Sequence, residues 1–300
     1  MTSVVIVIAL LLDQLLGEVK KWHPLVGFGR MAQYVERRFN RQPGSKKHMV
    51  GVLGVTILVP PLVLSSLALS IWLGPLFDMA LLYFAVGARS LVEHARAVID
   101  ALEMADLELA RQRVGMIVSR DTTAMQRTDI VRATIESVLE NGADAIFAPL
   151  FWFIVAGAPG VVLYRLVNTL DAMWGYRTER FSQFGWCAAR LDDLLNWLPA
   201  RITALGYAMM GNARASLTSW RTQSGLLDSP NAGVVMTAGA GALGVMLGGP
   251  CSYWGTSVDK AYFGVGQSPF SGDIYRAIDL LHKNMILWIV VVLVGGWILA

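Results

Sequence analysis

The stretch VGVLGVTILVPPLVLSSLALSIWL, Val50 to Leu73, carries no charged side chain. A helix needs about 20 predominantly apolar residues to cross the ~30 Å hydrocarbon core of a bilayer. This stretch meets that requirement, although it contains Pro60 and Pro61. It therefore predicts a helix that spans a membrane.

The composition of the whole chain supports the same class. Hydrophobic residues make up 55% of its 300 residues, charged residues make up 16%, and the mean hydropathy is +0.51. Soluble globular domains carry about 25% charged residues, so we predict an all-α polytopic membrane protein. The net charge of +3 is too small to indicate nucleic-acid binding. The two cysteines, Cys187 and Cys251, lack the spacing of a zinc site or a disulfide framework.

Other apolar runs extend this prediction to several spans within one membrane domain covering residues 1–300. The N-terminal run has no basic start and no small-residue cleavage site, so we expect a retained first helix rather than a signal peptide. Cytoplasmic helical segments and broken or re-entrant helices complete the expected fold. The expected spans lie near residues 4–16, 50–73, 75–88 and 285–300.

Charge sets the expected orientation. Residues 17–48 carry eight Lys and Arg residues against Glu18 and Glu36, and loops rich in Lys and Arg remain on the cytoplasmic side. We expect residues 17–48, 89–141 and 164–200 to be cytoplasmic. Pro or Gly interrupts the apolar runs 145–163 and 233–249, which are therefore expected to be re-entrant or buried, since broken helices persist only where protein or a cavity surrounds them.

Two segments show helical periodicity outside the expected spans. Apolar residues recur at helical spacing over 89–120, with a break near Asp106, and again over 127–145. In the second segment Glu136, Glu140 and Asp144 fall at every fourth residue. Carboxylates entering an apolar environment are costly unless they are paired or bound to metal. The stripe fits either a solvated helix face or a site for Mg²⁺, which typically takes one or two carboxylates plus substrate phosphates.

Three polar segments are further candidates for binding. Ser119 to Thr122 reads SRDT, which fits either helix capping or a phosphate-binding corner. Asp and Arg residues alternate from 165 to 201 beside several Trp and Tyr residues, which fits surface ion pairing or the lining of a site for a large, flat, polar ligand. Residues 229–233 read SPNAG, which is a turn signal.

A glycine-rich run over 233–249 contains the pattern G-x-G-x-x-G. The dinucleotide-binding fingerprint needs a preceding strand and a full following helix, whereas residues 248–250 would end any helix at once, so we reject that function. The same run has small residues at fourfold spacing, which indicates a close helix-packing face, formed by Ala240, Gly244 and Gly248.

In order along the chain stand the segments LDQLLGE, HPLVGFGR, ARSLVEHARAVIDAL, VSRDT, ATIESVLENGADAIFAPLFW, YRLVNTLDAMWGYR, AARLDDLLNWLPAR and SPNAG. This series, from residue 10 to about residue 280, resembles the CobD/CbiB family of cobalamin biosynthesis, adenosylcobinamide-phosphate synthase. The chain departs from the family at Gly17-Glu18-Val19, where an acidic residue is often followed by Pro. Its final segment also departs, and neither change touches the polar motifs.

The resemblance implies a multi-pass enzyme of the bacterial inner (cell) membrane. Such an enzyme would use ATP and Mg²⁺ to join adenosylcobyric acid, a corrinoid, to (R)-1-amino-2-propanol or its O-phosphate. The expected partners are these substrates, the lipid bilayer and other cobalamin-assembly enzymes, with no nucleic acid among them. The alternatives are a membrane transporter, for which we find no inverted repeat, and a non-catalytic sensor of related fold, which would have lost the polar motifs.

Roles for the polar residues follow from this chemistry. An acid–amine ligase needs cations around the reacting phosphates and a base for the incoming ammonium. The expected metal ligands are Glu136, Glu140 and Asp144, with Asp121 or Asp171. The expected phosphate and substrate contacts are Ser119, Arg120, Thr122, Asn168, Arg177, Arg190, Arg201, Ser229 and Asn231. Asp192 or Asp193 is the expected base. His23, in a tight turn, fits either a structural role or an acid–base role.

Overall fold

The computed structural model describes residues 1–19, 23–40, 47–253 and 256–298. Helices dominate this part of the chain, and its strands are short. The chain divides into two compact units. Of the described residues, the first unit contains those within 1–87 and 144–196, and the second contains those within 88–143 and 197–298.

The predicted all-α membrane fold class is confirmed. Four helical stretches are long and apolar enough to cross a membrane, namely Lys47–Leu73, Pro75–Glu103, Arg127–Trp174 and Gly272–Ile298. Two further apolar helices, Thr2–Leu16 and Ala232–Leu243, are shorter. The basic residues Lys20, Lys21, Arg41 and Lys46, on which the expected orientation partly depends, lie outside the described residues, as do Leu299 and Ala300.

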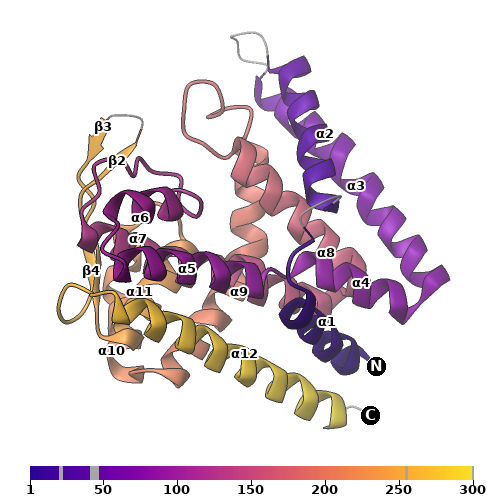
Figure 1. Cartoon of the computed structure of the whole chain (residues 1–300). Coiled ribbons are helices and arrows are strands. Elements are labelled where there is room, and N and C mark those ends of the chain that lie inside the picture. The colour runs from indigo at the N-terminus through magenta and orange to yellow at the C-terminus, as the bar shows by residue number, and fades with distance from the viewer. Residues whose placement is uncertain (20–22, 41–46, 254–255, 299–300) are drawn as a thin grey trace. The chain divides into compact units, whose positions relative to one another are not determined.

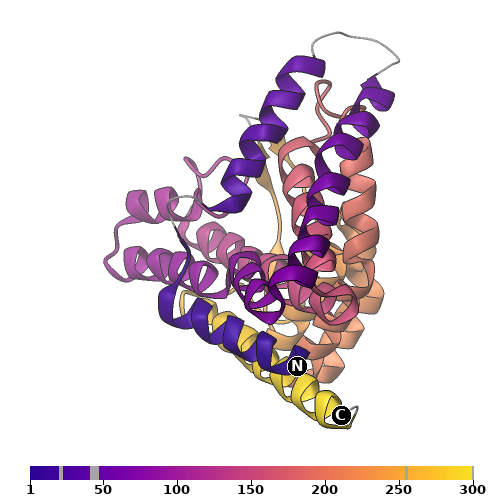
Figure 2. The same cartoon turned by 90° about the vertical axis from the view of Figure 1, so that its right-hand side faces the viewer.

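Helices α3 and α8 form the centre of the first unit. They pack along each other, and α2 contacts both (Figure 2), while α4 contacts α1 and α8. The helices of this unit are α1 (Thr2–Leu16), α2 (Pro24–Phe39), α3 (Lys47–Leu73), α4 (Pro75–Ala85), α8 (Ala148–Trp174) and the beginning of α9 (Trp186–Met210).

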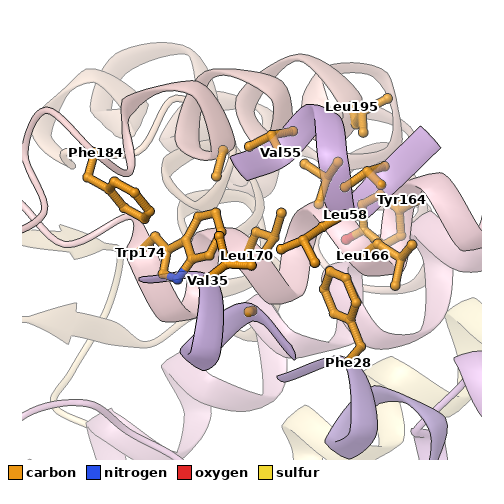
Figure 3. Packing of buried hydrophobic residues seen from close by; sticks show 14 of the residues in the cluster. Phe28, Val35, Val55, Leu58, Tyr164, Leu166, Leu170, Trp174, Phe184 and Leu195 are labelled. Atoms are coloured by element: carbon orange, nitrogen blue, oxygen red, sulfur yellow. The ribbon is translucent and has the colours of Figure 1, made fainter. Parts of the chain in front are cut away.

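A cluster of buried side chains fills the space between these helices (Figure 3). Tyr164 and Trp174 of α8 are almost completely buried in it, and Trp174 meets Phe184 edge-on with ring centroids 4.8 Å apart. Between helices that span a bilayer, such side chains stabilise the fold through close van der Waals packing rather than through removal of apolar surface from water. Gly51 lets α3 approach this cluster closely, because a Cβ atom there would overlap the backbone carbonyl of Phe184.

Helix α8 is broken, as its Pro and Gly residues predict. A single π-helical turn, η1 (Ala143–Phe147), precedes α8. Within α8, Gly157 has φ 61° and ψ −151°. That conformation is accessible essentially only to glycine. Pro159 follows two residues later, near the start of the second half-helix, where its missing N–H costs little. The re-entrant course of 145–163 stays a prediction.

The second unit combines helices with two small antiparallel sheets of two strands each (Figure 1). Helices α5, α6 and α7 contact one another, α12 packs on α7 and α5, and α10 packs on α11. Its helices are α5 (Ala88–Glu103), α6 (Leu107–Val114), α7 (Arg127–Gly142), α10 (Ala213–Gln223), the 3₁₀ turn η2 (Ser224–Leu226), α11 (Ala232–Leu243) and α12 (Gly272–Ile298). The paired strands are β1 (Met246–Gly248) with β4 (Tyr262–Gly264), and β2 (Cys251–Tyr253) with β3 (Thr256–Val258).

Two expectations for this unit need correction. Helical structure over 89–120 ends at Val114, because the chain turns at Gly115 and continues without regular structure to Gln126. The expected helix face of Ala240, Gly244 and Gly248 does not exist, because Gly244 adopts φ 70° and ends α11, and Gly248 lies in β1. By contrast, the helix predicted over 127–145 is confirmed as α7 and η1.

Helix α12 begins at Gly272, well before the expected start of the terminal span at residue 285. The turns before residue 285 contain charged residues, so hydropathy does not predict them as part of a membrane span. Asp273 accepts a hydrogen bond from the backbone N–H of Phe270 at 3.0 Å and pairs with Arg276 at 2.6 Å. A carboxylate at a helix N-terminus also interacts favourably with the helix dipole, which explains the earlier start.

Candidate functional site

The predicted site residues divide between the two units. The first unit holds His23, Asp144, Asn168, Asp171, Arg177, Arg190, Asp192 and Asp193. The second unit holds Ser119, Arg120, Asp121, Thr122, Glu136, Glu140, Arg201, Ser229 and Asn231. Within the units, the structure brings several of these residues together in three local groups.

The first group, the α8–α9 polar cluster, consists of Tyr164, Asn168, Asp192 and Asn196. Asn168 Nδ2 donates to one carboxylate oxygen of Asp192 at 3.2 Å, and Asn196 Nδ2 donates to the other at 3.0 Å. The Tyr164 hydroxyl lies 3.1 Å from Asn196 Oδ1 and 3.0 Å from the carbonyl oxygen of Asp144. Two amide side chains thus hold the Asp192 carboxylate in one orientation.

The two neighbouring carboxylates of α9 differ in environment. Burial raises the pKa of Asp192, and the hydrogen bonds from Asn196 and Asn168 oppose that rise only in part. Asp193 instead pairs with the exposed Arg190 at 3.2 Å. A carboxylate whose pKa is raised toward the working pH is the better general base, so the geometry favours Asp192 over Asp193 for that role.

Three residues of this region were missing from the predicted site. Tyr164 and Asn196 complete the cluster, and the Arg165 side chain extends toward Asn168, with Nη1 and Oδ1 3.4 Å apart. The signal for them was present in the sequence. Tyr164 and Asn168 are four residues apart, as are Asp192 and Asn196, and such pairs lie on one helix face.

The second group, the Arg120–Glu136 corner, lies at α7 in the second unit. Arg120 Nη2 is 2.7 Å from Glu136 Oε2, and the backbone N–H of Gly248 donates to Glu136 Oε1 at 2.7 Å. Glu136 is 4% exposed. Its carboxylate therefore joins α7, the SRDT segment and β1, and its charge is already balanced by Arg120. Thr122 is half-buried nearby in sequence, and Ser119 is exposed.

The five predicted metal ligands do not share one arrangement. Across residues 1–19, 23–40, 47–253 and 256–298, no three His, Cys, Asp or Glu side chains form a group that could hold a metal ion. The π-helical turn begins between Glu140 and Asp144, so their fourfold spacing no longer fixes a shared face. Asp121 is bonded by Thr123, whose N–H and hydroxyl lower its pKa. A Cβ atom at Gly175 would overlap Asp171 Oδ1. The metal site stays a prediction.

The third group joins Arg201 of α9 to the SPNAG turn. Arg201 Nη1 donates to Asn231 Oδ1 at 2.7 Å and to the Trp197 carbonyl at 2.8 Å. Its guanidinium stacks on the Trp197 ring, 4.6 Å from the centroid, and burial lowers its pKa. Ser229 Oγ accepts from the backbone N–H of Ala232 at 3.2 Å, at the start of α11. Three predicted contacts from two separate motifs thus lie together.

His23 and Arg177 have simpler surroundings. His23 Nδ1 accepts a hydrogen bond from the Leu25 N–H at 3.2 Å and so caps α2, which has Pro24 at its first turn. Burial is the main cause that lowers the pKa of His23. The buried, neutral, capping ring favours the structural role over the acid–base role. Arg177 is exposed in the segment after α8.

The chain is similar to known proteins over almost its whole length. The family model described as "CobD/Cbib protein" matches residues 6–281. The chain is 54% identical to "Cobalamin biosynthesis protein CobD" of Stutzerimonas stutzeri (strain A1501) over 294 residues, which cover 97% of each. The protein of the same name from Chromobacterium violaceum is 54% identical over 290 residues, 94% of this chain and 92% of that relative.

A more distant relative of the same name, from Mycobacterium tuberculosis (strain ATCC 25618 / H37Rv), is 38% identical over 287 residues. The match covers 93% of this chain and 90% of the relative. No solved structure matches the chain.

Proposed function

The chain belongs to the CobD/Cbib protein family, and from this premise we propose that it is an acid–amine ligase of cobalamin biosynthesis. A role in cobalamin biosynthesis follows from the family itself. The proposed reaction joins the side-chain carboxylate of adenosylcobyric acid to (R)-1-amino-2-propanol or its O-phosphate with consumption of ATP. The product is adenosylcobinamide or its phosphate.

One observation of the structure carries this proposal. The half-buried Asp192 carboxylate is held by Asn168 and Asn196, one amide on each oxygen. Only a neutral amine attacks an activated carboxyl group, so the incoming ammonium must first lose a proton. Burial raises the pKa of Asp192. A carboxylate with a higher pKa is a stronger base and removes the proton of the ammonium more readily. The two amides keep the carboxylate oriented without adding a positive charge that would weaken it.

The phosphate-binding roles fall to arginines. Arg201 is preoriented by the Trp197 ring and Asn231, at the N-terminus of α11, where backbone N–H groups and the helix dipole also favour anions. Arg120 is held by Glu136. Guanidinium groups bind phosphate through parallel hydrogen bonds. We assign Arg201, with Ser229 and Asn231 positioning it, as the principal phosphate contact, and Arg120 as a second one.

The residues fit a nucleotide-borne Mg²⁺ better than a metal caged by protein alone. Glu136 is balanced by Arg120, and no three potential ligands group together in the described part of the chain. Mg²⁺ commonly needs only one or two carboxylates when phosphates supply the remaining oxygens. Glu140 and Asp144 are the candidates for that role. When bound, the ion would neutralise phosphate charge.

The proposed location is the bacterial inner membrane, with the corrinoid and the amine reaching the site from the cytoplasm. Four stretches long and apolar enough to cross a bilayer support a membrane location. Other cobalamin-assembly enzymes are proposed partners because corrinoid intermediates must be passed between successive steps.

Purified protein in nanodiscs tests the proposal directly. With adenosylcobyric acid, aminopropanol phosphate and Mg-ATP, we expect ADP and the amide product in equal amounts, and separate reactions with aminopropanol identify the true amine. Glu140→Gln is expected to abolish product while the protein stays folded in membranes, and the exposed Glu108→Gln serves as the matched control. Absence of ADP and amide with every amine tried would reject the ligase.

A transporter is the second candidate, because Gly157 breaks α8 in the manner of discontinuous transporter helices. Accumulation of a corrinoid inside sealed vesicles without any amide product would favour it.

A further inference from the structure

Arg165 lies one residue after Tyr164 on α8 and is neither the proposed base nor a proposed phosphate contact or metal ligand. It is half-buried in a helical stretch apolar enough to cross a membrane. Its Nη1 atom contacts Asn168 Oδ1 at 3.4 Å, a weak hydrogen bond. Its Nε atom is shielded from solvent and has no hydrogen-bond partner among the residues that the structure describes. Buried cations without such partners are costly and mark functional positions in membrane helices.

The unused side of this guanidinium has a specific chemistry. Nε–H and the adjacent Nη2–H point in parallel, and together they form the fork that receives both oxygens of a carboxylate. The contact of Arg165 with Asn168 uses the opposite nitrogen, Nη1. The carboxylates of Glu18 and Asp144 act on its charge from nearby. They balance that charge at a distance, and among the described residues Nε–H has no acceptor.

Asn168 connects Arg165 to the base. Its Oδ1 faces Arg165 Nη1 and its Nδ2 donates to Asp192 Oδ1 at 3.2 Å. One amide side chain thus separates a guanidinium with an unpaired Nε–H from an oriented, half-buried carboxylate. An amide ligase must bind two reactants of opposite charge side by side, a carboxylate and an ammonium. Arg165 offers a positive charge to the carboxylate, and Asp192 offers a negative charge to the ammonium.

We propose that Arg165 binds the reacting carboxylate of the corrinoid acid through its Nε–Nη2 edge. The inference rests on the proposed ligase function and names the acid subsite within it. The neighbouring His23 is buried, and its Nδ1 accepts a hydrogen bond from the Leu25 N–H, so its ring does not carry the positive charge here. Arg165 supplies that charge. A guanidinium stays charged when buried, whereas a Lys ammonium loses its proton more readily.

The test measures binding rather than turnover. Wild-type protein in phosphatidylcholine nanodiscs is dialysed against adenosylcobyric acid and, separately, against adenosylcobinamide, which has an amide in place of that carboxylate. Corrinoid absorbance reports both dissociation constants without ATP. We expect Arg165→Gln to weaken binding of the acid about 10- to 100-fold, the range of lost charge-assisted hydrogen bonds. Binding of the amide should change by less than about twofold.

Two variants guard against a purely structural effect. Arg165→Lys keeps a charge without the fork and should recover only part of the preference for the acid. Arg38→Gln removes an exposed cation of α2 in the same unit and should leave both constants unchanged. Equal weakening of acid and amide binding by Arg165→Gln would overturn the proposal, because it would indicate a packing role.

The remaining outcomes separate this proposal from the ligase function. Unchanged acid binding by Arg165→Gln, with amide product still formed by the wild type, overturns the Arg165 assignment and leaves the ligase standing. No acid binding and no product from the wild type reject both. A preference that disappears in nanodiscs containing phosphatidylglycerol would show that Arg165 holds a lipid phosphate, which also overturns the assignment.

Discussion

Replacing Glu136 should destabilise the protein by an amount that its surroundings predict. Its carboxylate accepts from Arg120 Nη2 and from the Gly248 N–H, both at 2.7 Å, and the side chain is 6% exposed. Breaking a buried ion pair from one side costs about 3–5 kcal/mol. The Arg120 side chain keeps 20% exposure, so water relieves part of that cost. We expect Glu136→Leu to lower the free energy of unfolding by about 3 kcal/mol.

A graded series isolates the ion pair. Glu136→Gln keeps an acceptor but loses the charge, and should cost about 1–2 kcal/mol. The double variant Arg120→Met with Glu136→Leu replaces both charged partners by apolar groups and should recover the part of the loss that comes from the unpaired Arg120 charge, while the Gly248 N–H still lacks its acceptor. Reversible unfolding by sodium dodecyl sulfate in mixed micelles measures each value. The control is Glu93→Gln, which breaks a mostly exposed pair with Arg89 and should cost less than about 0.5 kcal/mol.

The reasoning is refuted if Glu136→Leu behaves like Glu93→Gln, or if the double variant is as unstable as the sum of its parts. A rival role for Glu136 has a different signature. If this carboxylate served as a metal ligand, Glu136→Gln would retain its stability and lose only Mg²⁺-dependent activity.

Three further predictions concern the first unit. Gly157→Ala should destabilise the protein by about 1–3 kcal/mol, because Gly157 has a conformation that essentially only glycine adopts. The control Gly27→Ala, which has open space around the added Cβ, should be neutral or stabilising. Equal melting temperatures of the two variants would contradict this reasoning. The folded pKa of Asp192 is raised by burial, so the stability contributed by this group in the wild type should rise as the pH falls through that pKa. Asp192→Asn, which turns an amide N–H toward one of the two donors, should lack this pH-dependent rise. Product formation by the wild type should fall on the acid side over the same range, and identical pH profiles of stability for the two proteins would argue against burial as the cause. His23→Asn should retain stability and ligation because Asn also caps helices, while His23→Ala should lose about 1 kcal/mol; inactivity of a stable His23→Asn would restore His23 as an acid–base candidate.

The chain reveals its long helices because their signals are local. Absence of charge over Val50 to Leu73 predicts α3, and the helical period over 127–145 predicts α7. Helix α12 begins earlier than hydropathy indicates, since Asp273 caps it through contacts that hydropathy does not measure. The end of α11 at Gly244 depends on a left-handed backbone conformation, which fourfold spacing of small residues cannot predict.

The candidate site shows the same limit. The chemistry implied by the family resemblance predicted Arg201, Ser229 and Asn231 as substrate contacts, and the structure brings them together. The second partner of Glu136 is a backbone N–H at Gly248, which has no side-chain signature, so the carboxylate was expected to bind metal. Arg165 was counted as one of several alternating charges, because its unused Nε edge depends on where Asn168 and Asp192 lie.

Helix α11 has a consequence for biogenesis. Every residue from Gly233 to Leu243 is buried, and a 12-residue helix spans only about 18 Å, too short to enter the bilayer alone. It becomes covered by contacts with α7, α10, β4 and α12, and β4 and α12 follow it in the chain. Before α12 is made, α11 is covered by α7 and α10 but still lacks the contact with α12, so truncation before α12 should leave part of this apolar helix uncovered and make the chain more susceptible to proteolysis.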